Sequence, residues 1–271
     1  MFPVFLKTLR DSRRTIMALS IGFALYALFV LAFYPAIVEE AESFDELMES
    51  YPEEMLAFMT GGQSIEEFSL VDPGTFLNTE FSIWVLLILG AIVIRQALNS
   101  VTNPERDGTM DMLMSLPVSR TEVMIARIGA MAAMLFIVLT ASLAALLLGR
   151  TIWPEFDVSF MAMARAMYGA LLLLMVVGGV TFVLATVFPS RARFIGGLAY
   201  LFLIGTYLLH GFTAVIDSLS GLRPYLIWEY YNVRLLINEG IDWGNWALLF
   251  VVAWILLGLS WWAFDRKELG V

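Results

Sequence analysis

The sequence predicts an all-α membrane protein with six transmembrane helices and both termini in the cytoplasm. Two of the supporting observations are compositional: 60% of the 271 residues are hydrophobic and only 15% are charged. A soluble domain of this length needs a more polar surface than this composition supplies, so lipid is the expected solvent. The third observation is that apolar residues gather in six runs. Each run is about long enough to cross the ~30 Å hydrocarbon core of a bilayer.

Each run is predicted to be a helix, because an open strand would leave backbone N–H and C=O groups unpaired in lipid. The predicted spans are residues 16–38, 81–98, 124–148, 166–188, 194–216 and 246–264. Basic residues precede the first run, as in a signal peptide, but the run has the length of a full span. We therefore expect it to be retained as the first helix. Residues 1–271 are predicted to form a single transmembrane domain.

The basic residues predict the orientation, since cytoplasmic loops carry an excess of Lys and Arg. With the N-terminus inside, twelve of the 16 Lys and Arg lie on the cytoplasmic side. The four on the outer side are Arg150, Arg165, Arg223 and Arg234. Most Asp and Glu fall on the outer side, and this distribution accounts for the net charge of −9.

The first outer loop, residues 39–80, contains twelve carboxylates and no Lys or Arg. Apolar residues within 44–51 recur at i, i+3, i+4 and i+7, which is typical of an amphipathic helix. Patterns at 50–53 and 64–67 resemble helix starts, and 72–74 resembles a break. We expect short helices over the outer mouth of the bundle. The acidic residues favour a solvated face, and a site for a cationic substrate or metal ion is the alternative.

The second outer loop, residues 217–245, is rich in Trp and Tyr. These side chains favour the headgroup region of a membrane. The loop is predicted to enter the interface as short re-entrant helices. The alternative is an ordinary aromatic belt at the outer end of the sixth span.

The cytoplasmic connection between the second and third spans, residues 102–121, has an interpretable local pattern. Thr109 can cap a helix, and Pro117 ends it because the residue before a proline is pushed out of helical geometry. Ser119 and Glu122 have the spacing of a capping box and are predicted to begin the third span. The short helix between them is rich in Met, whose flexible side chain suits a surface that packs against a partner. The alternative is an interfacial helix that only joins two spans.

Residues 105–120 read Glu-Arg-Asp-Gly-Thr-Met-Asp-Met-Leu-Met-Ser-Leu-Pro-Val-Ser-Arg. This stretch resembles a segment of ABC-2 type transporter permeases, in which an acidic and basic cluster precedes Gly-Thr, an acidic-apolar helix and Leu-Pro-Val-Ser-Arg. The resemblance implies that the segment is a coupling helix, which docks into a groove on a separate ATPase subunit. The residues assigned to docking are Glu105, Arg106, Asp107, Gly108, Thr109, Met110, Asp111, Leu113, Met114, Leu116 and Pro117.

The resemblance extends along nearly the whole chain, through six helices, cytoplasmic termini and a structured outer connection before the last helix. It also implies an N-terminal elbow helix. Helices that lie on a membrane surface are typically amphipathic, and this one is expected to be so. This elbow is expected within residues 1–15, with Phe2, Phe5, Leu9 and Arg10 as its residues. The long acidic loop at 39–80 departs from the family, in which this loop is often much shorter.

The function implied is that of the permease subunit of an exporter. The chain has no Gly-x-x-x-x-Gly-Lys-[Ser/Thr] phosphate loop, and its two lysines, Lys7 and Lys267, lie in other contexts. ATP and Mg are therefore expected on a partner ATPase, with two copies per complex, and no cofactor or metal on this chain. We expect a dimer with a second permease copy or a related permease in a prokaryotic plasma membrane, in contact with lipids and without nucleic acid.

Polar residues within the spans favour structural interpretations. Arg95 and Arg127 lie near cytoplasmic ends and are expected to extend to the interface, with a coupling role as the alternative. His210 is the single histidine, so packing or a hydrogen bond to a neighbouring helix is expected rather than a metal site. Glycine pairs at 178–179 and 196–197 allow close helix approach or helix bending. Hydroxyl groups are expected to bond to their own backbone at Thr140, Ser142, Thr181, Thr186 and Thr206.

Other classes of protein are less consistent with the sequence. An ion-driven secondary transporter would normally place ionisable residues at mid-membrane depth, and these spans are almost free of them. An intramembrane enzyme would need a nucleophile or metal ligands, and the chain has no Cys and one His. A structural or regulatory membrane subunit without cargo is a further alternative.

Overall fold

The computed structural model describes residues 2–41, 43, 50–60, 69–106, 119–188 and 191–266. Within those residues the chain forms helices and no strand, and six helical segments are long and apolar enough to cross a membrane. The predicted all-α fold with six spans is therefore confirmed. The long helices are α1 (Phe2–Leu31), α6 (Ile83–Arg106), α8 (Arg120–Ile152), α9 (Phe160–Val187), α10 (Ala192–Val215) and α12 (Trp243–Asp265).

Shorter helices occupy both outer connections, as predicted. Some of them extend the first and second spans: α2 (Tyr34–Glu39), α5 (Pro73–Phe76) and the π-helix η2 (Leu77–Ser82), which leads directly into α6. The others are α4 (Glu53–Thr60), the 3-10 helices η3 (Asp217–Tyr225) and η4 (Ile227–Tyr230), and α11 (Val233–Asn238). We call this second group the outer cap.

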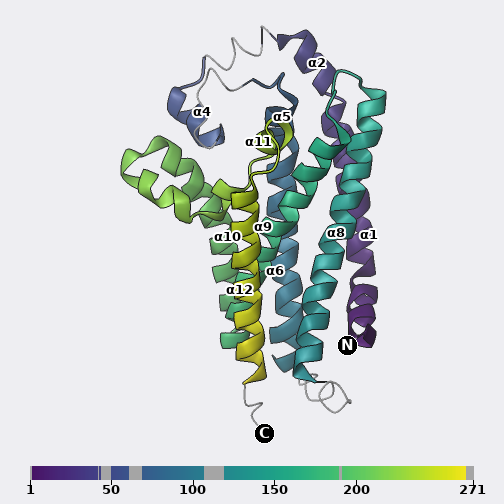
Figure 1. The fold of residues 1–271 in the computed structure, drawn as a ribbon, viewed down its shortest axis with the longest axis vertical. Helices are drawn as coiled ribbons and strands as arrows, with labels where there is room; N and C mark the ends of the chain where they lie inside the picture. Colours follow the sequence, from purple (N-terminus) through teal and green to yellow (C-terminus); the bar gives the residue numbers. More distant parts are fainter. Residues whose placement is uncertain are drawn as a thin grey trace.

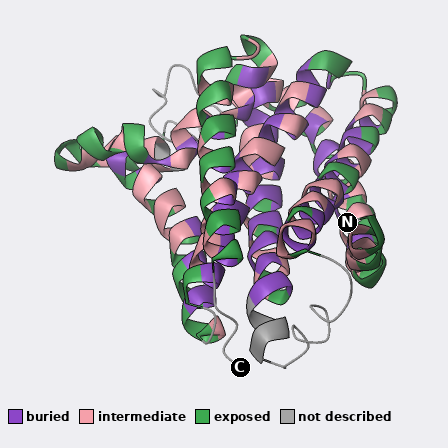
Figure 2. Cartoon of the chain, turned by 60° about the horizontal axis from the view of Figure 1, so that its bottom comes forward, coloured by how far each residue is buried: buried purple, intermediate pink, exposed green. Residues whose placement is uncertain are grey.

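The helices form a bundle in which α9 is central. It packs against α6, α8, α10 and α12, whereas α1 packs against α8 at one edge of the bundle. α1 begins and α12 ends at the same end, and the outer cap lies at the opposite end (Figure 1). Buried residues follow the inside of the bundle, and exposed residues cover the outward sides of the peripheral helices (Figure 2). We call the end where α1 begins the inner end, because the distribution of basic residues predicts that it faces the cytoplasm.

The second span begins at Pro73 rather than at residue 81, so residues 73–80 belong to a helix and not to the outer loop. Asp72 caps this helix: its side chain accepts a hydrogen bond of 2.8 Å from the backbone N–H of Thr75. Pro73 follows at the first helical position, where its missing N–H costs nothing. Residues 72–74 were predicted to be a break between helices, and they are the start of one. Asp and Pro occur both where helices end and where they begin.

The predicted start of the third span is confirmed. The Ser119 side chain accepts a hydrogen bond of 3.1 Å from the backbone N–H of Glu122. The Glu122 carboxylate in turn accepts one of 3.0 Å from the backbone N–H of Ser119. Together these bonds form the capping box that the spacing predicted, and they fix the residue at which the cytoplasmic connection becomes α8.

Small residues let the central helices approach closely. A Cβ added to Gly178 would lie 2.5 Å from the Met131 side chain and 3.1 Å from that of Val93. One added to Gly179 would lie 2.8 Å from the Cβ of Leu256 on α12. The predicted role of the 178–179 pair is therefore confirmed, since dispersion contacts between close backbones hold membrane helices together.

We predict that Gly179→Ala lowers the melting temperature of the detergent-solubilised protein. The new methyl group would meet the Cβ of Leu256, an atom fixed to the backbone. Overpacking of this kind costs about 1–3 kcal/mol, against a gain of up to ~1 kcal/mol in helix propensity.

Gly197→Ala is the matched control, because no atom lies within 4 Å of a Cβ at Gly197 on α10. It should leave the melting temperature unchanged or slightly higher. Equal effects of the two variants in a thermal unfolding assay would contradict the packing assigned to Gly179.

Candidate functional site

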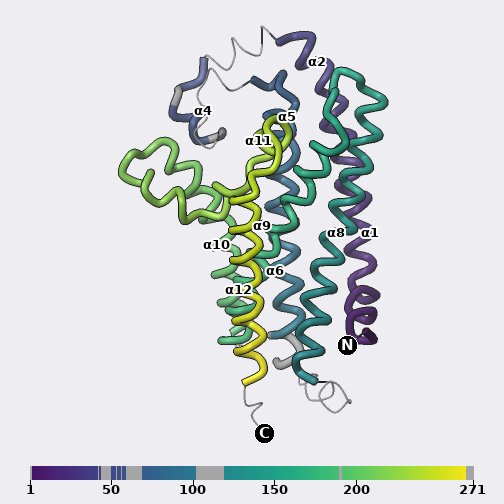
Figure 3. The backbone as a smooth tube through the Cα atoms, viewed as in Figure 1, coloured from purple at the N-terminus to yellow at the C-terminus, as the bar shows by residue number. Residues whose placement is uncertain are grey.

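The segment assigned to ATPase docking connects α6 with α8. Glu105 and Arg106 are the last residues of α6. The end of α6 and the start of α8 both lie at the inner end of the bundle (Figure 3). The remaining assigned residues lie outside the described part of the chain: Asp107, Gly108, Thr109, Met110, Asp111, Leu113, Met114, Leu116 and Pro117. Docking through this segment stays a prediction.

The residues assigned to an N-terminal elbow lie in the first turns of α1. This helix continues into the first span without the boundary expected at residue 15. Phe5 packs over Gly129 of α8, and Leu9 is partly buried against the core. Phe2 and Arg10 are exposed. The elbow residues and the first span therefore form one helix, whose 30 residues make a length of about 45 Å.

Arg127 is buried within the bundle and not extended to the interface as predicted. Its guanidinium donates a hydrogen bond to the backbone carbonyl of Ser100 on α6. A carbonyl group on a neighbouring helix is thus a polar partner of Arg127, which the sequence was expected to place at the membrane interface. Arg95 is exposed, in agreement with its expected position.

Further hydrogen bonds join helices near the inner end. The Ser12 hydroxyl of α1 donates to the side-chain oxygen of Gln96 on α6 over 3.4 Å. The Trp261 indole of α12 donates to the Thr121 hydroxyl of α8 over 3.0 Å. With the bond from Arg127, these contacts link α1 to α6, α6 to α8 and α8 to α12. The helix ends beside the docking segment are therefore coupled by directional interactions.

An apolar groove of about 420 Å³ separates α1 from α6 between the two ends of the bundle. Hydrogen bonds flank the groove on both sides: Ser12 of α1 bonds to Gln96 of α6 at the inner side, and the Tyr26 hydroxyl of α1 donates to the Glu80 carbonyl of η2 over 2.5 Å at the outer side. The groove is lined by Ala18, Leu19, Gly22, Phe23, Tyr26, Trp84 and Ile88. Such a surface suits an apolar or amphipathic molecule.

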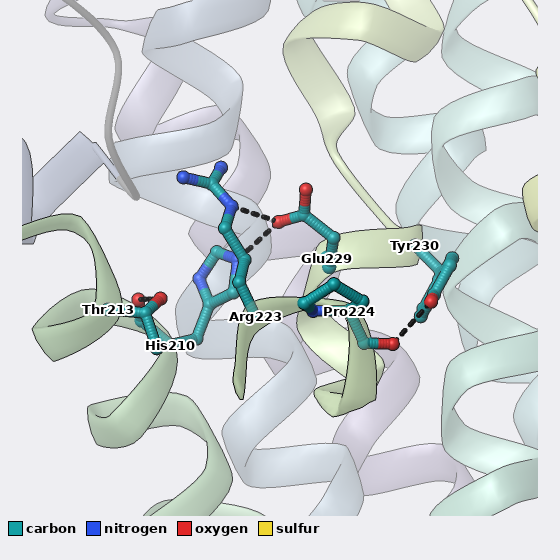
Figure 4. A network of polar contacts seen from close by, with 6 residues as sticks. All are labelled: His210, Thr213, Arg223, Pro224, Glu229 and Tyr230. Atoms are coloured by element: carbon teal, nitrogen blue, oxygen red, sulfur yellow. Dashed lines mark hydrogen bonds and ion pairs between the residues drawn. The ribbon is translucent and has the colours of Figure 1, made fainter. Parts of the chain in front are cut away.

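One carboxylate at the outer end joins three elements. Glu229 on η4 lies 3.0 Å from the ring nitrogen Nε2 of His210 on α10 and 2.7 Å from Nε of Arg223 on η3 (Figure 4). Burial raises the pKa of Glu229, but the hydrogen bonds and charges of His210 and Arg223 outweigh it and hold the pKa below its ordinary value. The ionised carboxylate therefore fastens the outer cap to α10.

A cavity of about 50 Å³ lies beside this carboxylate, between α10, η2, η4 and α4. Phe58 of α4 closes one side: a Cβ on Gly211 of α10 would lie 2.7 Å from its ring. The Trp228 indole donates to the Thr206 hydroxyl over 3.0 Å on another side. The lining combines aromatic side chains with polar ones: Phe58, Tyr207, Trp228, Tyr231, Asn78, His210 and Asn232.

The structure confirms two sequence expectations about polar residues in the spans. His210 makes a hydrogen bond, although its partner lies in the outer cap and not on another long helix. The hydroxyl groups named above bond to backbone carbonyls of their own helices: Thr140, Ser142, Thr181, Thr186 and Thr206. In the described residues no group of His, Asp or Glu could hold a metal ion.

Sequence reasoning missed the partnership of His210 with Arg223 and Glu229. His210 lies in an apolar run, whereas Arg223 and Glu229 lie in the loop that follows it, and the three residues do not form a known motif. The one available signal was the presence of charged residues, Arg223 and Glu229 among them, in the aromatic-rich outer loop that follows the helix of His210. The small cavity and the seating of α4 on α10 gave no sequence signal, because both depend on Gly211 facing Phe58.

Comparison with known families gives one match. The family model described as multidrug efflux system permease Rv1217c, C-terminal domain, matches residues 6–265. The match covers all six spans and every described helix of the outer cap. No curated protein matches the chain. The comparison favours the exporter interpretation over an ion-driven secondary transporter.

We predict that Glu229→Gln destabilises the protein at neutral pH. Hydrogen bonds to a charged group contribute about 1.5–3 kcal/mol, and the amide retains the shape without the charge. Because the pKa of Glu229 is lowered in the folded state, its stabilisation is present above the ordinary value of 4.5 and is lost as the pH falls through the lowered value.

Melting temperatures measured from pH 7 down to about pH 3 test this expectation. The Gln variant should melt lower than the native protein at neutral pH, and the difference should shrink in acid. Glu155→Gln is the control, because Glu155 is exposed between α8 and α9. An equal loss in both variants, or a pH-independent difference, would contradict the role of Glu229.

Proposed function

We propose that this chain exports amphipathic compounds, driven by ATP hydrolysis on a separate cytoplasmic ATPase. The chain belongs to the family of the multidrug efflux system permease Rv1217c C-terminal domain and is the membrane-spanning permease of an ABC-type efflux system. The single observation that carries this proposal is the family match over residues 6–265. The multidrug description of the family supports the substrate class. The chain is a transport subunit, and we place ATP and Mg on two ATPase copies in the complex.

We propose that residues 105–117 dock on the ATPase. The segment leaves α6 and enters α8 at the inner end, which is the cytoplasmic end by the distribution of basic residues. The Ser119–Glu122 capping box holds its far boundary, so a displacement of the segment acts on the first turn of α8. The buried bond from Arg127 to Ser100 then carries the same displacement to α6.

The groove between α1 and α6 is the proposed wall of the pathway. Its lining is apolar, and α6 leads directly into the docking segment, so movement of that segment changes the width of the groove. Trp84, which lines it, is exposed. A second permease copy, or a related permease, would face this groove and complete the pathway. This arrangement suits amphipathic cargo, whose apolar part can leave the lipid directly.

Docking is tested by co-expressing the chain with its ATPase and purifying through a tag on this chain alone. The native chain should retain an active ATPase. The double variant Leu113→Asp and Leu116→Asp places charges on the proposed apolar docking face and should lose at least about tenfold of the co-purified activity, since buried unpaired charges oppose binding.

Arg193→Glu serves as the control, because Arg193 is an exposed charge at the start of α10, outside the docking segment. It should retain the ATPase. If the double variant binds as well as the native chain, residues 105–117 are not the docking site. If the native chain captures no ATPase, the proposed complex is wrong.

The pathway is tested by Gly22→Leu. No atom lies within 4 Å of a Cβ at Gly22, so a leucine can enter the groove without disturbing the bundle. Export of a fluorescent amphipathic dye from cells should fall several-fold, while the ATPase still co-purifies.

The matched control is Gly258→Leu on α12, where a Cβ also meets no atom within 4 Å. It should leave dye export unchanged. Normal export by the Gly22 variant would exclude the α1–α6 groove from the pathway, whatever the outcome of the docking experiment.

A further inference from the structure

A second groove, of about 360 Å³, lies between the first turns of α1 and the middle of α8. Its floor and rim are apolar and include Leu9, Ile16 and Ile137. Two guanidinium groups, those of Arg10 and Arg13, also line it. The groove thus combines an apolar surface with two adjacent positive charges. Arg10 and Arg13 belong neither to the docking segment nor to the lining of the α1–α6 groove.

The two arginines are not engaged by other groups. In the part of the chain that the structure describes, neither makes an ion pair or a hydrogen bond. They are three residues apart on one helix and therefore lie on the same face. Lys7 and Arg14 add further positive charge to this part of α1, and Asp11 is its one carboxylate. Among the described residues, the groove consequently carries a positive charge without a partner carboxylate.

The position of the groove matches the cytoplasmic headgroup region. α1 is about 45 Å long, more than the ~30 Å hydrocarbon thickness, so its first turns extend beyond the hydrocarbon. Arg13 and Arg10 precede the apolar run that begins at Ile16. Arginine stems can lie along apolar surface while their guanidinium groups reach the phosphates. Ile16 follows the two arginines along α1, and Ile137 lines the groove from α8.

We propose that this groove binds a phospholipid with an anionic headgroup. The phosphate oxygens would accept hydrogen bonds from Arg10 and Arg13, and an acyl chain would lie over Leu9, Ile16 and Ile137. Basic pockets between transmembrane helices at the cytoplasmic side are suited to anionic lipids. A bound lipid would join α1 to α8, the neighbour on which α1 packs, and so hold the first turns of α1 against the bundle.

The test measures lipid retained by the purified full-length protein, using native mass spectrometry after equilibration with phosphatidylglycerol or phosphatidylcholine of identical chains. The native protein should retain phosphatidylglycerol selectively. Arg10→Gln with Arg13→Gln should lower this retention about tenfold or more, because each arginine near the surface contributes to attraction of anionic lipid. Lys7→Gln with Arg14→Gln removes the same charge outside the groove and should lower retention clearly less, because neither side chain lines the groove.

A second variant keeps both charges and fills the apolar part of the groove. Ile137→Trp, on α8, should also lower phosphatidylglycerol retention. Inorganic phosphate at millimolar concentration should not displace the lipid. Equal losses in the two paired-charge variants would show general attraction instead of a site, and displacement by phosphate would show an anion site without a lipid chain. Selective retention that survives both Arg10→Gln with Arg13→Gln and Ile137→Trp would overturn the proposal.

Discussion

Lipid offers no hydrogen-bond partner to a backbone N–H or C=O group, and this constraint shapes the whole molecule. It makes every span a helix, and it turns hydroxyl side chains such as Thr181 back onto their own helix. It also explains Arg127, which is buried and donates to the carbonyl of Ser100. With polar groups satisfied within or between helices, the middle of the bundle is held by close packing around Gly178 and Gly179.

Many directional contacts lie near the two ends of the bundle, in addition to bonds between helices such as that from the Tyr200 hydroxyl of α10 to the Ala91 carbonyl of α6. Asp72, Ser119 and Asp242 cap helices where the chain turns back toward the membrane. Glu229 binds His210 and Arg223 at the outer end, whereas the inner end has bonds between α1, α6, α8 and α12. This arrangement suits a transporter, because ends joined by directional bonds can transmit a displacement along the helices between them.

The sequence predicted the spans well because hydropathy and chain length are local properties. Ser119 with Glu122 was predictable for the same reason, since a capping box needs only a fixed spacing. The helical start at Pro73 was missed because Asp-Pro-Gly both ends and begins helices, and burial of Leu77 decides between them. The burial of Arg127 could not be predicted, because its partner lies on another helix.

One continuous stretch of helix connects the regions to which we assign function. α6 ends in the docking segment, and its first turns supply Trp84 and Ile88 to the apolar groove. At the outer end it continues from η2, whose Asn78 lines the cavity beneath α4. A π-helix breaks the regular hydrogen-bond ladder and is common at functional sites. η2 lies between the groove and the outer cap. A displacement of α6 in the proposed mechanism would therefore change the width of the groove and, through η2, the position of the outer cap.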